Sequence, residues 1–296
     1  MDGGDRCHVE AEFDTLKAEV RAAVETELMA RAASYADTPV RQAAIYAACG
    51  GGHRWRAIAA AAAGRIYRDD ALEVVIGGAC GVELAHAASM VLDDLPSMDD
   101  AALRRGKAAA HRVFPDWAVD MAPVFMLTMA YHMSLDNRRA EPDRRVAAAI
   151  LLSRAGQEMI AGQVSDLAED ASDEAALVAR YRGKAGSLYA AATAAGGVLC
   201  GADSDEMQAL HGAGMNLGIA YQFLDDVADV VASAEEVGKL PGSDHGKATA
   251  IDLFGVEGAR RRAQAYQEAA QADLAAFGPE ADLLRRLVGE ASWKAW

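Results

Sequence analysis

Apolar side chains recur at steps of three and four residues along almost the whole chain, and this spacing confines it to packed amphipathic helices. The periodic segments are 9–35, 40–48, 54–67, 70–93, 116–135, 143–170, 173–201, 203–235, 249–277 and 280–294. Proline and glycine mark the breaks between them, as at Pro39, Gly50-Gly51-Gly52 and Pro96. No stretch alternates apolar and polar residues between hairpin turns. The sequence therefore predicts an all-α fold of about ten helices.

The 296 residues predict one domain, residues 1–296, because the 7 prolines are scattered and no stretch has the composition of a linker. Hydrophobic residues make up 52% and charged residues 25%, which is typical of a folded domain with a sizeable core. Alanine, the strongest helix former, is abundant throughout and agrees with the helical periodicity.

The net charge of −15 opposes binding to nucleic acid or to an anionic membrane surface. No uninterrupted apolar run reaches the roughly 18 residues of a membrane span, and the acidic N-terminus lacks the order of a signal peptide. We therefore expect no nucleic-acid partner and no integral membrane protein. The cysteines Cys7, Cys49, Cys80 and Cys200 lie among small apolar residues without C-x-x-C spacing, which indicates free thiols and a cytoplasmic location.

Acidic residues gather at the end of the apolar segment 70–93. This first cluster and the arginines that follow it are Asp93, Asp94, Asp99, Asp100, Arg104 and Arg105. Carboxylates at this density repel one another unless a cation or the arginines compensate them. Pro96 ends or kinks the helix here, which turns Asp93 and Asp99 toward a common point. The alternative interpretation is a solvated helix end with ordinary surface charge.

A second acidic cluster lies in segment 203–235. Asp225 and Asp229 are four residues apart and share one face of a helix, whereas Asp226 projects about 100° away from Asp225. Like charges at this spacing destabilise a bare helix, so their apolar surroundings favour a hard cation beside them. Oxygen ligands without nearby histidine or cysteine indicate magnesium, which usually bridges carboxylates to substrate phosphates.

Together the two clusters resemble the aspartate-rich motifs of the all-trans isoprenyl diphosphate synthases, D-D-x4-D and D-D-x2-D. Further matches are Arg104-Arg105-Gly106, Gly162-Gln163 with Asp166-Leu167, Lys184 with Gly186, Tyr221-Gln222, Gly238-Lys239, Asp244 and Gly246-Lys247-Ala248-Thr249. The resemblance implies the single-domain isoprenoid synthase fold, with its helices around a central cavity, and usually a homodimer. It also implies three magnesium ions and two substrates, an allylic prenyl diphosphate and isopentenyl diphosphate.

The resemblance also implies a role for each motif residue. Asp93 and Asp99 would hold two magnesium ions and Asp225 the third. The aspartates expected to support these ions through water are Asp94, Asp226 and Asp229. The side chains expected to stabilise the departing diphosphate are Arg104, Lys184 and Lys239, with Gln222 one turn before the second motif. Loss of diphosphate would leave an allylic carbocation, which isopentenyl diphosphate attacks through its double bond.

The site for isopentenyl diphosphate is where the chain departs from the family. The residues that correspond to this site are His53, Arg56, His86 and Arg105. His53 replaces a lysine, and histidine is mostly neutral at pH 7 unless an anion raises its pKa. The other departures are Ala108-Ala109, Ala122-Pro123 and Ala185.

These departures leave alternatives open. The first interpretation is an elongating prenyltransferase. The second is a terpene-synthase-like enzyme, which ionises a prenyl diphosphate without isopentenyl diphosphate. The third is a weakly active partner subunit, against which the six intact motif aspartates argue.

Chain length in this family depends on the residues one turn before the first aspartate motif. Here these residues are Ala88 and Ser89, both small, so a growing chain can pass them and run deeper between helices. Met121, Phe125 and Met126 are the candidates for the floor of the pocket. The sequence therefore predicts the twenty-carbon product, geranylgeranyl diphosphate, over the fifteen-carbon one. Alternatively, Ala88 and Ser89 only permit close helix packing.

Overall fold

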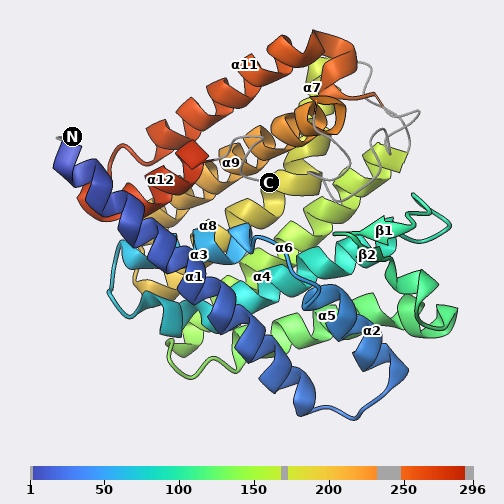
Figure 1. Ribbon diagram of the computed structural model, residues 1–296. Helices are drawn as coiled ribbons and strands as arrows, with labels where there is room; N and C mark the ends of the chain where they lie inside the picture. The colour runs from blue at the N-terminus through green and yellow to red at the C-terminus, as the bar shows by residue number, and fades with distance from the viewer. Residues whose placement is uncertain (1–2, 168–172, 232–247, 291–296) are drawn as a thin grey trace.

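The computed structural model describes residues 3–167, 173–231 and 248–290, with side chains from residue 8 onward. The described chain is a bundle of helices (Figure 1), and the predicted all-α class is confirmed. Its longer helices are α1 (Gly3–Ala33), α4 (Ala71–Asp93), α5 (Asp116–Leu135), α6 (Pro142–Leu167), α9 (Ser204–Val231) and α11 (Ala250–Asp273). The shorter ones are α2 (Pro39–Ala48), α3 (Trp55–Arg65), α7 (Glu174–Tyr181), α8 (Ser187–Cys200) and α12 (Asp282–Glu290). Most ends lie within a few residues of the predicted segments.

The predicted segment 173–201 is divided in the structure. Between α7 and α8, a turn of π-helix runs over Arg182–Gly186 and carries Lys184. Its glycines are needed for close packing, since a Cβ on Gly183 would lie 2.8 Å from the Cα of Gly162 in α6. Periodicity alone does not reveal this turn because the residues on both sides remain helical, and such turns are frequent at functional sites.

A small hairpin follows the first aspartate cluster, which the sequence did not predict. Strands β1 (Leu103–Arg104) and β2 (Lys107–Ala108) pair antiparallel. The turn residues Arg105 and Gly106 both have positive φ, 52° and 73°, as a tight two-residue hairpin requires. Strands of two residues are too short to show alternation. The hairpin lies beside the end of α4 (Figure 1), where Arg104 donates a hydrogen bond to Asp94.

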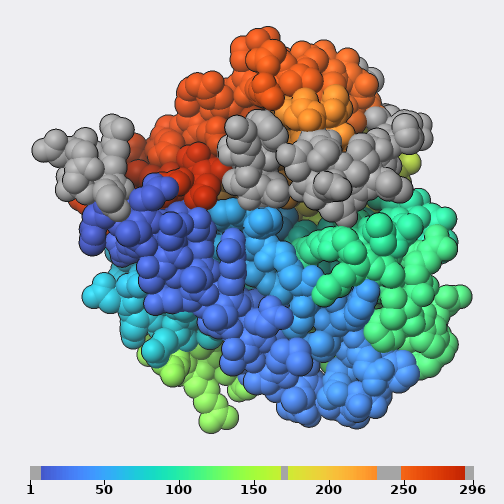
Figure 2. Space-filling model, in the orientation of Figure 1, coloured from blue at the N-terminus to red at the C-terminus, as the bar shows by residue number. Residues whose placement is uncertain are grey.

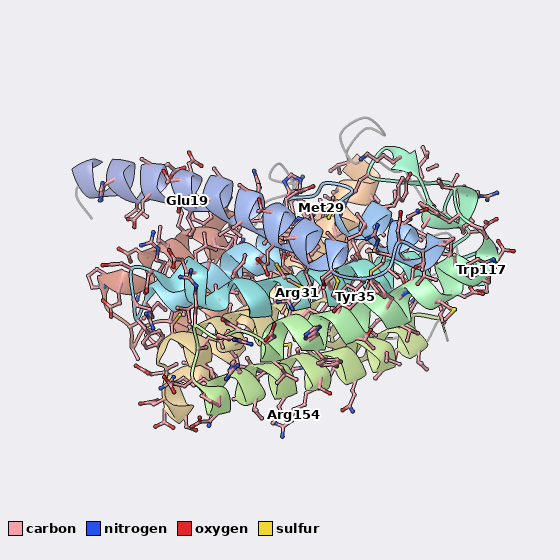
Figure 3. The ribbon with its side chains drawn as sticks, turned by 90° about the horizontal axis from the view of Figure 1, so that it is seen from below. Glu19, Met29, Arg31, Tyr35, Trp117 and Arg154 are labelled. Carbon is pink, nitrogen blue, oxygen red and sulfur yellow. The ribbon has the colours of Figure 1, made fainter. Side chains whose placement is uncertain are left out.

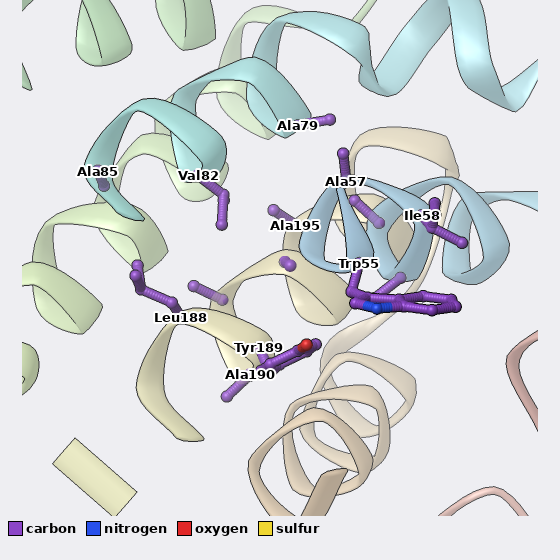
Figure 4. Packing of buried hydrophobic residues seen from close by; sticks show 14 of the residues in the cluster. Trp55, Ala57, Ile58, Ala79, Val82, Ala85, Leu188, Tyr189, Ala190 and Ala195 are labelled. Atoms are coloured by element: carbon purple, nitrogen blue, oxygen red, sulfur yellow. The ribbon is translucent and has the colours of Figure 1, made fainter. Parts of the chain in front are cut away.

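The core lies where α3, α4, α8 and α9 meet (Figure 4). α3 and α8 are buried on nearly all sides, which explains why both consist mainly of alanine and other apolar residues. Small side chains let the axes approach closely; Gly196 in α8, for example, lies against the backbone of Ala60 in α3. This packing fixes α4 and α9, whose C-terminal ends carry the two aspartate motifs.

α1 crosses the outside of the bundle, as the blue surface in Figure 2 shows, and packs on α3, α4 and α12. Seen from below, Arg31 and Tyr35 lie between α1 and α5 (Figure 3), where the Tyr35 hydroxyl forms a hydrogen bond with His132 at 2.7 Å.

The prediction of buried free thiols is confirmed for Cys80 and Cys200. Cys49 is also free, and Cys7 lies outside the described side chains.

α4 is, among the described helices, the one long and apolar enough to cross a membrane, with a mean hydropathy of 1.6. However, 78% of its apolar window is buried against other helices. That burial makes it the core helix of the bundle, so its composition is weak evidence for a membrane span.

Candidate active site

The first aspartate motif folds back on itself at the end of α4. The helix ends at Asp93, three residues before Pro96, as predicted. The backbone N–H of Asp99 then donates to the carbonyl of Asp93 at 3.0 Å, which brings the two aspartates to the same turn. The charge of Asp99 contributes to raising the pKa of Asp93. The predicted convergence of Asp93 and Asp99 is therefore found in the structure.

Asp93 is a buried carboxylate, 5% exposed, and burial raises its pKa to about 6. The charges of Lys184 and Arg104 act in the opposite direction, and neither forms an ion pair with it. Within the described residues its side chain has no hydrogen bond or ion pair. Burial therefore disfavours the ionised form of this acid, and a cation beside it would offset that cost.

Asp94 is held by the hairpin. Its carboxylate accepts hydrogen bonds from Nε of Arg104 at 3.0 and 3.2 Å and from Nη2 at 2.5 Å. Arg104 thus keeps a fixed orientation beside the motif, and the carboxylate raises its pKa. The structure adds Arg104 as the protein partner of Asp94, and the support of magnesium by Asp94 through water stays a prediction.

The second motif occupies the last turns of α9. Asp225 and Asp229 are half-buried, and Gln222 donates to Asp225 and Asp226 at 3.4 Å, as its place one turn earlier predicts. Asp226 is buried and accepts hydrogen bonds from the Tyr181 hydroxyl and, at 2.7 Å, from the backbone N–H of Ala250. This side chain therefore ties α9 to the start of α11, and its support of magnesium through water stays a prediction.

The π-helical turn that carries Lys184 packs against α6 and α9. Its ammonium group donates to Asp166 at 2.6 Å, and Arg180 lies 3.6 Å from the other oxygen of this buried carboxylate. Asp166 therefore positions Lys184, and the positive charge of Lys184 acts to lower the pKa of Asp93. Lys239, the other predicted lysine, lies outside the described residues.

Arginines from α3 and the hairpin surround His86. Arg56 stacks its guanidinium 4.6 Å from the ring centre of Tyr189, and Arg105 donates to the carbonyl of Gly51 at 2.7 Å. Burial, followed by the charges of these and neighbouring arginines, lowers the pKa of His86 well below its usual value. His86 is thus a neutral hydrogen-bonding group among cations, which suits an anion site.

Tyr221 connects the arginines to the second motif. Burial raises its pKa, the charge of Asp225 adds to this, and the charges of Arg56, Arg105 and Arg104 oppose it. Charged side chains from α3, the hairpin and α9 therefore all affect the pKa of the Tyr221 hydroxyl. Electrostatic contacts thus link the predicted arginines, His86 and Lys184 with the aspartates near the C-terminal ends of α4 and α9, and their binding of diphosphate stays a prediction.

His53 is exposed and stacks on Trp55, with ring centres 5.9 Å apart. Burial of part of the ring, then the charges of Arg21 and Arg105, lower its pKa. It belongs to the cationic region, as expected, but is neutral there. Arg54, between these residues, was assigned no role in the sequence; it is buried and pairs with Glu83 of α4. The one available signal was Glu83, a charged residue among apolar and small neighbours in the middle of the segment 70–93.

The predicted chain-length residues take different places. Ala88 is buried. Ser89 is half-buried, and its hydroxyl donates a hydrogen bond to the backbone carbonyl of His86. On α5, Met126 is buried and Phe125 half-buried, whereas Met121 is 56% exposed on the outer surface. Met121 is therefore wrong as a floor of a pocket inside this chain.

A pocket opens on the other side of the first motif, between α2, α4 and the hairpin. Its lining residues include Tyr46, Ala87, Met90, Asp94 and Arg105. The Tyr46 hydroxyl closes one wall by donating to the carbonyl of Ala108 at 2.8 Å. Asp94 and Arg104 both line this pocket, whereas Asp93 does not.

The donor set fits magnesium. In the described part of the chain no three histidine, cysteine, aspartate or glutamate side chains converge on a point that could hold a metal ion. Magnesium does not need such a cage, because it takes one or two carboxylates and completes its shell with water and substrate phosphates. The unpaired, buried Asp93 and the oxygen-only motifs meet this requirement.

Comparisons with known proteins show the family of the chain. The family model of polyprenyl synthetase matches residues 37–276. The chain is 32% identical to geranylgeranyl pyrophosphate synthase 12, chloroplastic, of Arabidopsis thaliana, with 86% of this chain and 73% of the relative covered. It is also 32% identical to a farnesyl diphosphate synthase of Geobacillus stearothermophilus, with 79% and 82% covered.

A solved structure, an FPP/GFPP synthase from Zymomonas mobilis, superposes with a TM-score of 0.83 at 28% identity, covering 94% of this chain and 98% of that one. The match to the family model extends over most of the chain and includes both aspartate motifs. The chain therefore belongs to the polyprenyl synthetase family.

Proposed function

We propose that this protein is a magnesium-dependent prenyltransferase, which condenses an allylic prenyl diphosphate with isopentenyl diphosphate. The observation that carries the proposal is the buried Asp93, which has no protein partner among the described residues and lies within electrostatic reach of Lys184 and Arg104. A magnesium ion bound together with diphosphate would supply the positive counter-charge that the ionised form of this buried acid lacks within the protein.

Asp93, Asp99 and Asp225 would hold the metal, which supplies charge neutralisation for the departing diphosphate. Arg104 is fixed by Asp94 and Lys184 by Asp166, so both cations are oriented before substrate arrives. Breaking the allylic C–O bond releases diphosphate; the double bond of isopentenyl diphosphate then forms the new C–C bond, and the proton lost passes to diphosphate.

Arg56, Arg105, His86 and His53 would bind the diphosphate of isopentenyl diphosphate. Two arginines supply fixed charge and neutral His86 supplies a hydrogen bond, so a neutral histidine at position 53 weakens this site without removing it. This supports an elongating enzyme over a terpene-synthase-like one or a weakly active partner subunit. We propose geranylgeranyl diphosphate as the product because Ala88 and Ser89 are small.

The test is incubation of the protein with farnesyl diphosphate and Mg²⁺, with and without isopentenyl diphosphate, followed by analysis of dephosphorylated products. We expect geranylgeraniol only when isopentenyl diphosphate is present, and no product with chelator or with Asp93→Ala. Cyclic or hydrolysed products formed equally without isopentenyl diphosphate would favour the terpene-synthase-like alternative. Absence of both would contradict catalysis by this chain alone.

We also propose a homodimer, formed through the outer faces of α5 and α6. Large apolar side chains are exposed along these helices, and Figure 3 shows Trp117 and Arg154 pointing away from the bundle. The apolar members are Trp117, Met121 and Val124 on α5, and Val146, Ile150, Ile160 and Val164 on α6. Stripes of this kind mark association surfaces. In sedimentation, Ile160→Glu should yield monomers and the exposed control Val230→Glu should not.

The remaining proposals follow from composition. The free thiols and the helical fold support a cytoplasmic enzyme acting as one domain over residues 1–296, without a nucleic-acid partner and not integral to a membrane.

A further inference from the structure

Glu83 is buried in the middle of α4, one turn before His86, and the proposed reaction gives it no role. Its carboxylate contacts the segment that opens α3. Oε1 accepts a hydrogen bond from the backbone N–H of Ala57 at 3.1 Å, and Oε2 lies 3.4 Å from Nη1 of Arg54. The side chains of Glu83 and Arg54 are only 4% and 3% exposed, so this contact joins two buried charges.

The contact with Ala57 is a helix cap supplied from a neighbouring helix. Ala57 lies in the first turn of α3, whose N–H groups lack partners within the helix. Arg54, the residue immediately before α3, makes no capping hydrogen bond with its side chain. The Glu83 carboxylate fills that place and also faces the positive end of the helix dipole. Figure 4 shows Ala57 beside α4.

The segment before α3 has an unusual backbone. Gly51, Gly52 and Arg54 have positive φ, at 94°, 110° and 58°. For an arginine this conformation costs on the order of 1–2 kcal/mol, so other contacts must retain it. The Arg54 guanidinium provides them, since it donates to the carbonyl of Ala48 at 2.6 Å and pairs with Glu83.

The same segment presents the cations of the second diphosphate site. Arg56 follows directly in the first turn of α3, and Arg105 rests on the carbonyl of Gly51. A Cβ on Gly52 would lie 2.8 Å from the Arg105 guanidinium carbon, so the position of this loop decides where Arg105 can lie. Both arginines act on His86.

We propose that Glu83 is a positioning residue for the binding of isopentenyl diphosphate: it fixes the segment 51–57, and with it Arg56 and Arg105, against α4. This inference rests on the proposed function, because it takes these arginines as the site of that diphosphate. Glu83 does not contact the aspartate motifs, so its effect is confined to one of the two substrates.

A simple electrostatic role for Glu83 makes the opposite prediction. A negative charge near Arg105 opposes anion binding, so removing only the charge would tighten the binding of diphosphate. Removing the positioning contacts displaces Arg56 and Arg105 and weakens it. The direction of the change therefore separates the two roles.

The variants are Glu83→Ala, which removes both contacts, and Glu83→Gln, which keeps an acceptor for Ala57 and loses the ion pair. Glu25→Gln is the matched control, since this half-exposed carboxylate lies 3.8 Å from Arg54 and makes no hydrogen bond to the described residues of α3. We expect the KM for isopentenyl diphosphate to rise about tenfold in Glu83→Ala and less in Glu83→Gln. The KM for the allylic substrate, kcat and the Mg²⁺ requirement should stay within about twofold, and Glu25→Gln should match wild type.

An equal rise of both KM values, or a lower melting temperature with an unchanged KM for isopentenyl diphosphate, would overturn the proposal. A tighter KM would assign Glu83 the electrostatic role instead. If Glu83→Ala does not fold, Glu83→Gln carries the same comparison.

Binding of inorganic pyrophosphate in EDTA tests Glu83 without turnover. Without metal the aspartates repel this anion, so the arginines supply the binding. We expect calorimetric affinity to fall about tenfold in Glu83→Ala and to be unchanged in Glu25→Gln. Wild-type protein that binds pyrophosphate but does not use isopentenyl diphosphate would contradict the proposed function alone, whereas equal affinities in wild type and Glu83→Ala would contradict the role of Glu83 alone.

Discussion

The hydroxyl of Tyr181 donates a hydrogen bond to the carboxylate of Asp226, joining the end of α7 to the second aspartate motif. The same carboxylate oxygen accepts the backbone N–H of Ala250 at 2.7 Å. Asp94 has a similar place in the first motif, where Arg104 binds it. In each motif the second aspartate therefore holds a neighbouring segment, whereas the first aspartate is the one proposed to hold metal.

This division predicts different effects for neighbouring substitutions. Asp226→Ala removes the acceptor of two buried donors, so we expect it to lower the free energy of unfolding by about 1–3 kcal/mol. Asp225→Ala should leave stability nearly unchanged and lower turnover about a hundredfold or more, because it removes stabilisation of the leaving diphosphate. Urea denaturation and kcat measure the two effects. Full turnover by Asp225→Ala would contradict its role in holding metal.

The stability of the metal-free protein should depend on the protonation of Asp93. Burial raises its folded-state pKa to about 6, above the usual 3.8, so the neutral acid favours folding. Its contribution is fully present below pH 4 and is lost as pH rises through about 6. In EDTA, the melting temperature of wild type relative to Asp93→Asn should therefore fall between pH 4 and pH 7.

Magnesium with pyrophosphate should reverse this loss for wild type at pH 8, where the acid is charged, and have little effect at pH 4.5. The same ligand should stabilise Asp93→Asn much less. A wild-type profile parallel to that of Asp93→Asn in EDTA would show that Asp93 keeps its ordinary pKa.

Replacing His53 with lysine should lower the KM for isopentenyl diphosphate, because lysine carries a fixed charge where the histidine is neutral. Wild-type affinity should weaken as pH rises, and the structure moves this titration to lower pH, since burial, Arg21 and Arg105 lower the pKa of His53. We expect the change mainly below pH 6.5. His53→Gln is the control and should be independent of pH in this range. An unchanged KM in His53→Lys would make the residue structural.

Product length should respond to Ala88. A tyrosine at this buried position of α4 fills space that a growing chain needs, so Ala88→Tyr should shift the product from geranylgeraniol to farnesol after dephosphorylation. Ala88→Leu should give a mixture, and mass analysis of the products measures the ratio. An unchanged product with activity retained would place the floor elsewhere, for example at Phe125 or Met126 alone.

The sequence by itself determined the helices and the positions of the acidic motifs along them. Spacing of three and four residues is a local property, so it located α4 and α9, and the spacing of Asp225 and Asp229 put them on one face. Pro96 likewise predicted where α4 ends and where the chain turns Asp99 back toward Asp93.

Only the tertiary structure decided the partners of these residues. Tyr181 meets Asp226, and Glu83 meets Arg54, across distances in the sequence that no periodicity records. Packing also decided which face of α5 is covered, and so placed Met121 outside. The physical reason is that burial and charge pairing depend on which helices lie side by side, whereas helix formation depends on residues within a few turns of one another.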